Sequence, residues 1–528
     1  MMSNDGKRPA IVVAATPTSN GDLHVGHMAG PYLTGDVFSR YLAATGRPVT
    51  YTTCTDDSQS YVITTAHRKN MAPQHLCDTS TKAIEQSMAA LGLSMAGLPP
   101  IDDTYRAAVT GFFTALHEAG RLSLRTVRLP YASRSGTYLY DGLMTGTCPS
   151  CLAGSSGGVC EGCGHPNNFD ELLSPSYVLD PSDPVTYREA TILVLPMENY
   201  RDRLVDYFAA RERVWRPHPM QLIRELLAGP LPEVPITMPG EWGVAAPFRE
   251  TPGQILYPWV EAMPAVMYST WWAAAQRGEQ AEHIDEFWRA EHDADIVYFH
   301  GFDNVYHWGL MDLVMLLAHE DRYSTPAGNI CNEFYNLAGD KFSTSRDHVI
   351  WCSDLTAEVP RDLVRFYLSL TAPEHQKTDF SVAALRDVAG RRLVRPWNKL
   401  AESVSLLASS GGELPVSVDG KARAAIMADR FRACYALDGF STSRAADMIV
   451  SQVSRLCATA EGGQLGGDLL FEVQTLLAWA APILIDATSL AAATGADLSL
   501  DPDGPVWQRS AVNRFTLPVL PSPELART

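Results

Sequence analysis

Two segments of the chain carry side chains suited to binding phosphate groups, and the first is His24-Val-Gly-His27. It follows an apolar run, residues 11–15, and a turn-rich stretch, so we expect it to begin a helix. Backbone amides and the helix dipole attract anions there, and imidazoles three residues apart share one face and can donate to phosphate oxygens. Gly26 lets a flat nucleotide base approach the backbone. Taken alone, the tetrapeptide could also supply capping histidines or zinc ligands.

The second segment, residues 339–346, has the sequence GDKFSTSR and places one lysine, Lys341, among small residues. Such a loop can fold over a triphosphate, and its lysine can neutralise the departing pyrophosphate. Ser343 and Ser345 add hydroxyl groups to the loop. A lone loop of this kind is more often solvated surface, so its meaning depends on the first segment.

Four clustered cysteines predict a zinc site. They form two CxxC pairs separated by eight residues, a spacing that lets four thiolates converge on one Zn²⁺. Because four thiolates leave no open coordination position, we expect a structural rather than a catalytic zinc. The six other cysteines are scattered singly, which suits a reducing, cytoplasmic location. The predicted ligands are Cys148, Cys151, Cys160 and Cys163.

Strands alternating with helices predict an α/β fold with a doubly wound parallel sheet, whose ligands bind at the carboxyl ends of the strands. The strands are expected at residues 11–15, 49–53 and 295–300. We predict two halves of a Rossmann-like catalytic domain at residues 6–121 and 253–330, an inserted connective domain with the cysteine knuckle at 122–252, the Lys341 loop and a linking domain at 331–395, and a helical bundle at 396–528.

Composition argues against two classes of partner. The 42 basic and 60 acidic residues among 528 give a net charge of −18, and a field of that sign repels nucleic acid unless a basic patch overrides it. The N-terminal residues lack the apolar segment of a signal peptide. The most apolar late stretch, residues 476–485, is about half the length that crosses a bilayer. We therefore expect no membrane contact.

Together, the motifs resemble those of class I aminoacyl-tRNA synthetases. HVGH is similar to their HIGH signature and KFSTS to their KMSKS signature. TDD at 55–57, YPWVEA at 257–262, GFDN at 301–304 and the segment 332–346 resemble the methionyl-tRNA synthetase family in particular. The resemblance covers essentially the whole chain. It implies a class I parallel sheet split by a zinc-knuckle insertion and followed by an all-α bundle.

The resemblance also implies a reaction and a set of site residues. In this family the carboxylate of an amino acid attacks the α-phosphate of ATP in line, which needs positioning, charge neutralisation and Mg²⁺ rather than a protein nucleophile. Asp57 falls where the family binds the α-ammonium group, and Trp259 where it walls the side-chain pocket. The implied catalytic residues are His24, His27 and Lys341; the ATP contacts are Pro17, His24, Gly26, His27, Asp303, Lys341, Ser343 and Ser345; the amino-acid contacts are Ala15, Thr16, Thr18, Asp57, Trp259, Asn304 and Trp308.

The chain departs from the family at the methionine pocket. Thr16 and Thr18 stand where the family has leucine and tyrosine, and Trp308 stands where it has histidine. Met263 and Val266 replace a proline and a tyrosine. Because size and polarity change together, we expect glycine or another small or polar amino acid to fit better than methionine. The family has the tripeptide Thr-Arg-Asp where this chain has Thr-Met-Pro at 237–239, so an arginine that is implicated in activation is missing.

The second departure concerns tRNA. Asn398 matches one anticodon-recognising residue of the family, but residues 456–467 lack the expected tryptophan and so lack a base-stacking platform. From residue 396 onward there are ten basic and fourteen acidic residues, whereas phosphate contacts need clustered cations. We therefore expect that tRNA is not a partner.

Three hypotheses of function follow. The first is an ATP-dependent ligase that adenylates a small or polar amino acid and transfers it to a small-molecule amine or hydroxylamine, as in natural product biosynthesis. It is similar to the synthetase-like part of cupin-linked hydrazine-forming enzymes, and it would require a separate cupin protein. The second is a genuine methionyl-tRNA synthetase with a divergent pocket. The third is a catalytically dead binding protein, against which the retained His24, Lys341 and Asp57 argue.

Overall fold

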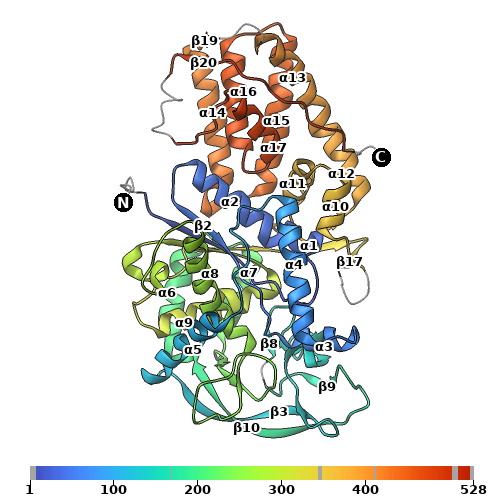
Figure 1. The fold of residues 1–528 in the computed structure, drawn as a ribbon, viewed down its shortest axis with the longest axis vertical. Helices are drawn as coiled ribbons and strands as arrows, with labels where there is room; N and C mark the ends of the chain where they lie inside the picture. Colours follow the sequence, from blue (N-terminus) through green and yellow to red (C-terminus); the bar gives the residue numbers. More distant parts are fainter. Residues whose placement is uncertain (1–6, 168, 343–347, 409–411, 502–508, 524–528) are drawn as a thin grey trace.

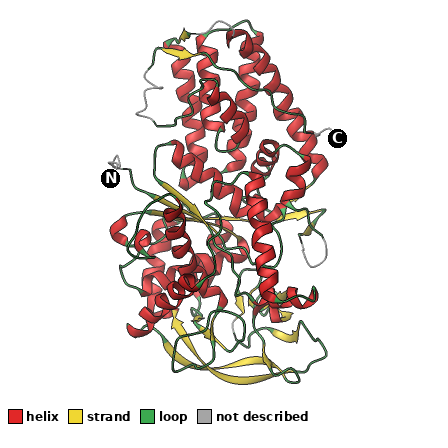
Figure 2. Ribbon diagram, in the orientation of Figure 1, coloured by secondary structure: helices red, strands yellow, loops and turns green. Residues whose placement is uncertain are grey.

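The computed structural model describes residues 7–167, 169–342, 348–408, 412–501 and 509–523. The molecule is elongated, with an α/β part at one end and a mostly helical part at the other (Figure 1). Figure 2 shows most strands in the lower part and packed helices above them. The predicted α/β architecture with a terminal helical bundle is confirmed, whereas the exact domain boundaries stay predictions.

Four parallel strands form the sheet that positions the site. Their order is β15-β14-β1-β2, and every neighbouring pair is parallel. The carboxyl ends of all four therefore meet at one edge, and three of the strands coincide with strands predicted from the sequence. The strands are β1 (Ala10–Ala14), β2 (Val49–Thr52), β14 (Asp295–Gly301) and β15 (Gly328–Asn332).

Strand β1 is apolar throughout because helices cover both of its faces. Val12 packs in one core with Val37, whereas Ile11 and Val13 pack in a second core with Met263. A strand buried on both faces needs no alternation of polar and apolar residues. The helices of the two cores include α4 (Pro73–Leu91) on the first side and α5 (Asp103–Glu118), α8 (Ala262–Gln276) and α9 (Asp312–Ala318) on the second.

The helix predicted to begin at His24 forms, but it is not uniform. A π-turn, η1 (Met28–Tyr32), separates α1 (Val25–His27) from α2 (Leu33–Ala44). Pro31 lies inside the π-turn, where a residue without a backbone N–H interrupts the regular hydrogen bonds.

The inserted segment is built on one long antiparallel pair, β3 (Ser123–Ala132) and β10 (Val185–Pro196). The cysteines lie among short strands that follow β3. These strands are β4 (Thr137–Tyr138), β5 (Met144–Thr147), β6 (Gly154–Ser156), β7 (Gly158–Val159), β8 (Pro166–Asn167) and β9 (Leu173–Tyr177), and later come α6 (Arg201–Arg211), α7 (Pro217–Ala228), β11 (Glu233–Pro235), β12 (Thr237–Met238) and β13 (Ile255–Leu256).

A buried ion pair fastens the helical part to the catalytic part. Arg365 of α11 donates to Asp36 of α2 at 2.7 Å and to the carbonyl of Pro482 at 2.7 Å, with neither charged side chain exposed. The helices of this part are α10 (Cys352–Glu358), α11 (Arg361–Leu370), α12 (Val382–Val388), α13 (Arg395–Ala408), α14 (Val418–Tyr435), α15 (Thr442–Glu461), α16 (Gly467–Ala480) and α17 (Ile485–Ala493).

Among the described residues, no helix is long and apolar enough to span a membrane.

Candidate active site

Backbone hydrogen bonds tie the HVGH turn to the chain that follows the Lys341 loop. The amide of Val25 donates to the carbonyl of Ile350 at 2.9 Å, and the amide of Cys352 donates to that of Leu23 at 3.1 Å. The two segments predicted to bind phosphate are therefore held side by side at the edge of the sheet.

The histidines of this turn face the second segment through aromatic stacking. The rings of His24 and His27 are nearly parallel, with centroids 3.6 Å apart, and Phe342 stacks on His24 at 4.8 Å. His24 also caps the helix, because its Nδ1 accepts the amide of His27 at 3.3 Å. In the neutral ring, Nε2 then carries the proton and is the donor.

Gly26 is the residue that this close packing requires. A Cβ atom at Gly26 would lie 3.0 Å from Nδ1 of His24 and 3.2 Å from Phe342. Lys341 lies in the short strand β17 (Asp340–Lys341), whose backbone pairs with β16 (Tyr335–Leu337). Ser343 and Ser345 lie outside the described residues, so the predictions for them stay predictions.

Asp57, the residue predicted to bind the α-ammonium group, lies where the segments that follow β1 and β2 meet. Thr18 and Asp56 pair through their backbones, and the amide of Asp56 donates to Pro17 at 2.9 Å. The hydroxyl of Ser19 donates to Asp57, and Trp242 donates to the carbonyl of Asp57 at 2.7 Å. Burial raises the pKa of Asp57, which remains partly exposed. A cationic group that reached this carboxyl would favour its charged form.

Four more of the predicted contacts lie at the same carboxyl ends of the strands: Asp303 and Asn304 after β14, and Ala15 and Thr16 after β1. Asn304 donates to Asp303 at 3.0 Å directly after β14. The amide of Ala15 donates to the carbonyl of Phe299 at 2.9 Å, and Thr16 follows it. These residues form one continuous rim around the carboxyl ends of the strands.

His307, rather than Trp308, stacks on Trp259. The ring centroids of His307 and Trp259 are 3.7 Å apart and the planes differ by 5°. The indole of Trp308 instead packs edge-on against Tyr298, and only 2% of Trp308 is exposed. Burial lowers the pKa of His307 to about 3, so this ring is neutral near pH 7. The sequence resemblance points to Trp308 at this place, and nothing in the sequence indicates that His307 packs on Trp259.

Two buried carboxyl groups behind Trp259 are also absent from the sequence prediction. Glu261 accepts from Ser58 at 2.9 Å and from Tyr105 at 3.2 Å, and Asp141 accepts from Tyr257 at 2.8 Å. Burial raises the pKa of each to about 7. Each acid stands alone in its own segment, so no sequence pattern links them.

The four predicted zinc ligands converge. Their sulfur atoms all lie within 4.8 Å of one another, and the Cys148–Cys163 and Cys151–Cys160 separations are 3.8 and 3.6 Å. Tetrahedral zinc with sulfurs at about 2.3 Å requires sulfur separations of about 3.8 Å, so the cluster fits this ion.

The cysteine knuckle backs directly onto the amino-acid end of the site. Gly158 has φ +81°, and a Cβ there would lie 2.5 Å from Oδ1 of Asp141 and 3.5 Å from Nε1 of Trp259. Gly164 approaches Phe302, the residue before Asp303, so closely that a Cβ on Gly164 would lie 3.4 Å from the Phe302 ring. The knuckle therefore supports both sides of the proposed pocket.

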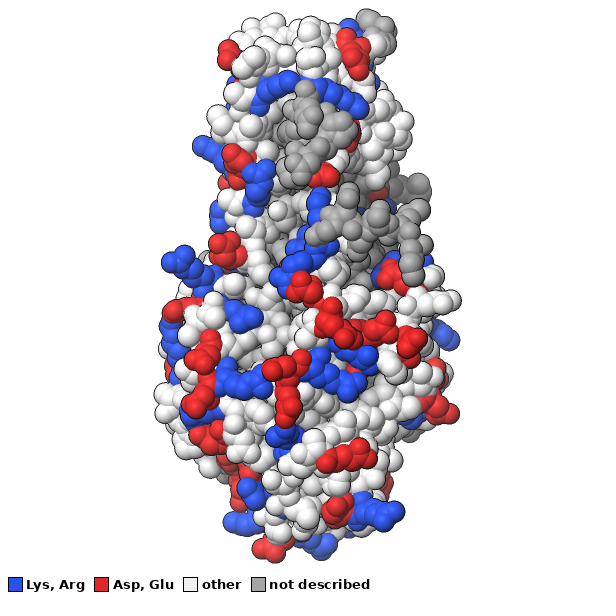
Figure 3. All heavy atoms as spheres, turned by 90° about the vertical axis from the view of Figure 1, so that its left-hand side faces the viewer, with Lys and Arg blue, Asp and Glu red and all other residues white. Residues whose placement is uncertain are grey.

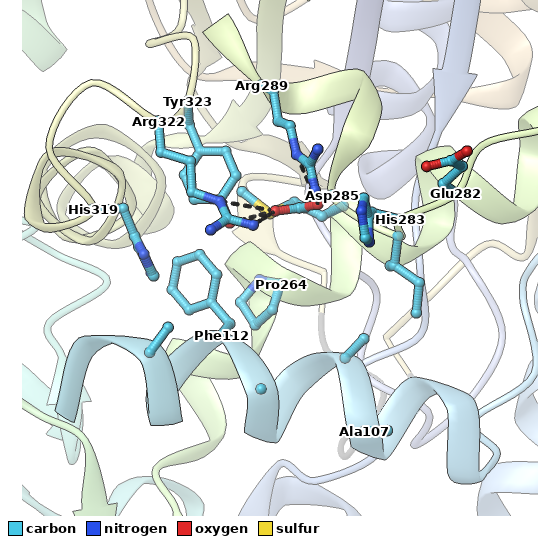
Figure 4. Close-up of a pocket in the computed structure, with 15 residues that line it drawn as sticks. Ala107, Phe112, Pro264, Glu282, His283, Asp285, Arg289, His319, Arg322 and Tyr323 are labelled. Atoms are coloured by element: carbon cyan, nitrogen blue, oxygen red, sulfur yellow. Dashed lines mark hydrogen bonds and ion pairs between the residues drawn. The ribbon is translucent and has the colours of Figure 1, made fainter. Parts of the chain in front are cut away.

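A separate pocket of about 570 Å³ lies on α5, and none of the predicted site residues lines it (Figure 4). Both of its guanidinium groups bind Asp285, which accepts from Arg322 at 2.6 Å and from Arg289 at 2.9 Å, and Arg289 also lies 3.8 Å from Glu291. The pocket therefore offers no group that the predicted chemistry uses.

Comparison with known proteins identifies relatives of one kind. Residues 10–404 match the family described as tRNA synthetases class I (M). A methionine–tRNA ligase of Roseiflexus sp. (strain RS-1) is 31% identical over 77% of this chain and 70% of that protein. One of Christiangramia forsetii is 29% identical over 70% of this chain and 53% of that protein, so the chain spans about half of that relative's length.

Solved structures share the fold. The Mycobacterium tuberculosis methionyl-tRNA synthetase bound by methionyl-adenylate superposes with a TM-score of 0.75 at 17% identity, covering 98% of this chain and 100% of that one. The class I fold predicted from the sequence, with its zinc-type cysteine cluster and helical C-terminal region, is confirmed.

The knuckle should hold about one zinc ion per chain and stabilise the site behind it. Cys160→Ser removes one thiolate, and we expect lost zinc, a lower melting temperature and a KM that rises more for the amino acid than for ATP. Metal analysis with thermal denaturation checks this. Cys77→Ser, a buried cysteine outside the cluster, should retain zinc; full zinc in Cys160→Ser would contradict the assignment.

Asp141 and Glu261 should each contribute a decline in stability as pH rises from about 4 to about 7, because over this range the unfolded chain releases protons that the two folded groups, with pKa values near 7, retain. Glu261→Gln removes one such group and should flatten the decline by roughly 1 kcal/mol per pH unit. Urea unfolding at about pH 5 and about pH 7 measures the difference. The exposed Glu402→Gln should behave like wild type, and an unchanged slope in Glu261→Gln would refute the assignment.

Proposed function

The chain belongs to the class I tRNA synthetases, and we propose that it activates the carboxylate of an amino acid with ATP to form an aminoacyl adenylate. One observation carries the proposal: His24, His27 and Phe342 are stacked at the same sheet edge as Asp57. We infer that this turn binds phosphate and that Asp57 binds the ammonium group, because the two follow the ends of the adjacent strands β1 and β2.

The proposed chemistry needs positioning more than a reactive side chain. The donors of His24 and His27 hold the triphosphate at the start of the helix, where the dipole favours anions. Asp57 holds the α-ammonium group, which directs the carboxylate oxygen at the α-phosphorus. Lys341 neutralises the pyrophosphate as the bond to it breaks, and Mg²⁺ supplies further charge neutralisation.

Methionine and tRNA are the first candidate substrates. The relatives over most of this chain are named methionine–tRNA ligases, which supports this alternative. The sequence resemblance at Asp57, Trp259 and Asp303 supports the same alternative.

A second candidate, a small or polar amino acid transferred without tRNA, is favoured by the helical part. Nδ2 of Asn398 donates to the carbonyl of Leu520 at 2.9 Å, and its Oδ1 accepts the amide of Leu520 at 2.7 Å. Trp397 donates to Pro518 at 2.8 Å. The C-terminal tail therefore engages both polar atoms of the residue expected to recognise an anticodon base.

Several cations of the helical part are paired with acids of the same part. Lys399 pairs with Glu461, and Arg392 pairs with Asp447 at 2.7 Å. On the face shown in Figure 3, basic and acidic side chains are intermixed. A protein binds a phosphate backbone mainly because its lysines and arginines neutralise phosphates and release their counterions. Cations that are already paired with acids contribute less to this release, so we expect this surface to bind tRNA weakly.

The acceptor in this second candidate is a small-molecule amine or hydroxylamine. Its nitrogen attacks the carbonyl carbon of the adenylate, AMP leaves with the bonding electron pair, and the nitrogen loses a proton to solvent. In the most specific form of this proposal, the oxygen of a hydroxylamine attacks the adenylate instead and AMP leaves. The amino nitrogen of the bound amino acid then attacks the hydroxylamine nitrogen, so that an N–N bond forms, the N–O bond breaks and the carboxylate leaves with the electron pair. A separate cupin protein would be a partner of this reaction.

Pyrophosphate exchange into ATP, run with each of the twenty amino acids, tests the proposal. At least one amino acid should support exchange, and His24→Ala should lower kcat/KM by about 100-fold because a preorganised phosphate donor is lost. His75→Ala, an exposed histidine of α4, should match wild type. Absence of exchange with every amino acid would overturn the proposal.

The same assay separates the two candidates. Methionine-specific exchange with charging of bulk tRNA supports the first. Exchange with a small or polar amino acid that is indifferent to tRNA supports the second.

A further inference from the structure

We propose that the site binds a second ammonium group, carried by an aliphatic amine, in a small buried cavity behind Trp259. The inference rests on the proposed adenylating function and names the chemical class of one of its substrates. The cavity has a volume of about 20 Å³ and is bordered by Asp141, Asn167, Tyr257 and Met238. A space of that size holds one water-sized group, and an ammonium head is of that size.

Two buried acceptors in this cavity lack partners. Oδ2 of Asp141 and Oδ1 of Asn167 make no hydrogen bond within the described part of the chain, and each residue is only 1% exposed. The remaining atoms are engaged, since Tyr257 donates to Asp141 and Asn167 donates to Ser155 at 3.1 Å. The indole N–H of Trp259, a buried donor that makes no other hydrogen bond in the described part of the chain, also points at the carboxyl of Asp141 and partly offsets the rise in its pKa that burial causes. A buried acceptor without a donor is costly, so the pair points to a ligand that donates.

Further acids lie close to this carboxyl. Ser60, on the segment that begins with Asp56 and Asp57, accepts the amide of Gly142 at 2.8 Å, and Ser58 of the same segment donates to Glu261. Burial raises the pKa of Asp56, and the negative charges of Glu261, Asp57 and Asp141 raise it further. The segment 56–60 thus joins four carboxyl groups in one buried region.

Among the described residues, only Arg106 acts on one of these acids: burial raises the pKa of Asp57, and the positive charge of Arg106 partly offsets that rise. In the described residues, no lysine, arginine or histidine forms a salt bridge with any of the four, and the side chain beside Asp141 in the cavity is the neutral Met238. Asp36 shows the usual solution: this buried carboxyl is paired with Arg365 at 2.7 Å and Arg40 at 2.8 Å, and its pKa is lowered. Asp141 and Glu261 have no such cationic partner, and burial raises the pKa of each to about 7 instead.

An ammonium group fits the acceptors better than a metal ion. Among the described residues, only the four cysteines bring their ligand atoms within 4.8 Å of one another. The carboxyl groups around Asp141 do not converge in that way. An ammonium donates up to three directed hydrogen bonds to separate acceptors, and the aromatic rings that line the cavity, Tyr140, Phe169 and Tyr257, suit its alkyl stem.

The ammonium can belong to either substrate. On the activated amino acid it stays protonated while the carboxylate attacks ATP. On the acceptor it stays protonated while a second, neutral nitrogen attacks the adenylate and AMP leaves. The shared chemistry is an aliphatic primary ammonium, and the two sources give different results in the assays below.

Matched pairs of substrates test the proposal on the wild-type protein. Ornithine and norleucine differ by an ammonium in place of a methyl, and pyrophosphate exchange should show a kcat/KM at least about 10-fold higher for ornithine, equivalent to about 1.4 kcal/mol. If the acceptor carries the ammonium, adenylate of a neutral amino acid should discharge at least about 10-fold faster onto 1,5-diaminopentane than onto pentylamine. Ratios near or below one in both assays would overturn the inference.

In Asp141→Asn, the preference for the substrate with the extra ammonium, whichever of the two assays shows it, should fall towards one. In Asp183→Asn the same preference should stay at the wild-type value. Asp183 is the matched control because it is a buried acid of the same inserted segment that accepts from the amides of Arg134 and Ser135. Thermal denaturation shows whether each variant folds, and the wild-type ratios decide the question if Asp141→Asn does not. A folded Asp141→Asn with the wild-type ratio would overturn the inference.

The failure of this inference differs from failure of the proposed function. Exchange with norleucine or methionine, with both ratios flat, leaves amino-acid activation standing and means that the cavity holds water. Absence of exchange with every amino acid overturns both.

Discussion

The backbone hydrogen bonds between residues 23–25 and 350–352 hold together parts of the chain that lie at opposite ends of the catalytic fold. They close the first helical turn onto the chain that follows the Lys341 loop, and they let Phe342 stack on His24. Because neither segment alone has more than a weak preference for phosphate, this pairing turns two ambiguous motifs into one candidate site. The sheet supports the pairing by placing the ends of β1 and β14 next to each other.

The amino-acid end depends on a different contact, the packing of the cysteine knuckle against Asp141 and Trp259. Gly158 permits an approach that any side chain would prevent. The inserted segment therefore acts as the rear wall of the pocket. The buried pair of Arg365 with Asp36 plays a comparable role at the other end, where it fixes the helical part against α2.

The sequence predicts the features that depend on local patterns. The strands at β1, β2 and β14, the helix after His24 and the four converging cysteines follow from short-range periodicity and spacing, and the structure has them. Residues that act through distant contacts are not predictable in this way. Asp141 and Glu261 come together only through the tertiary fold, and the tail that engages Asn398 lies more than a hundred residues away in sequence.

The position of Trp308 has a local physical cause that sequence patterns do not reveal. Residues Val305–Met311 form a π-turn, η8, which rotates successive side chains by less per residue than an α-helix does. In this geometry His307 faces Trp259 and the indole of Trp308 faces Tyr298. The ring that stacks on Trp259 is therefore the neutral imidazole of His307, and the prediction that Trp308 contacts the amino acid stays a prediction.

Direct detection of an enzyme-bound aminoacyl adenylate tests whether the protein activates an amino acid with ATP. The protein is mixed with α-labelled ATP, Mg²⁺ and the amino acid that best supports exchange, without tRNA, and the products are separated after a single turnover. An adenylating enzyme should form an aminoacyl-AMP together with an equal amount of pyrophosphate. Formation of ADP and phosphate, or no consumption of ATP with any amino acid, would contradict it.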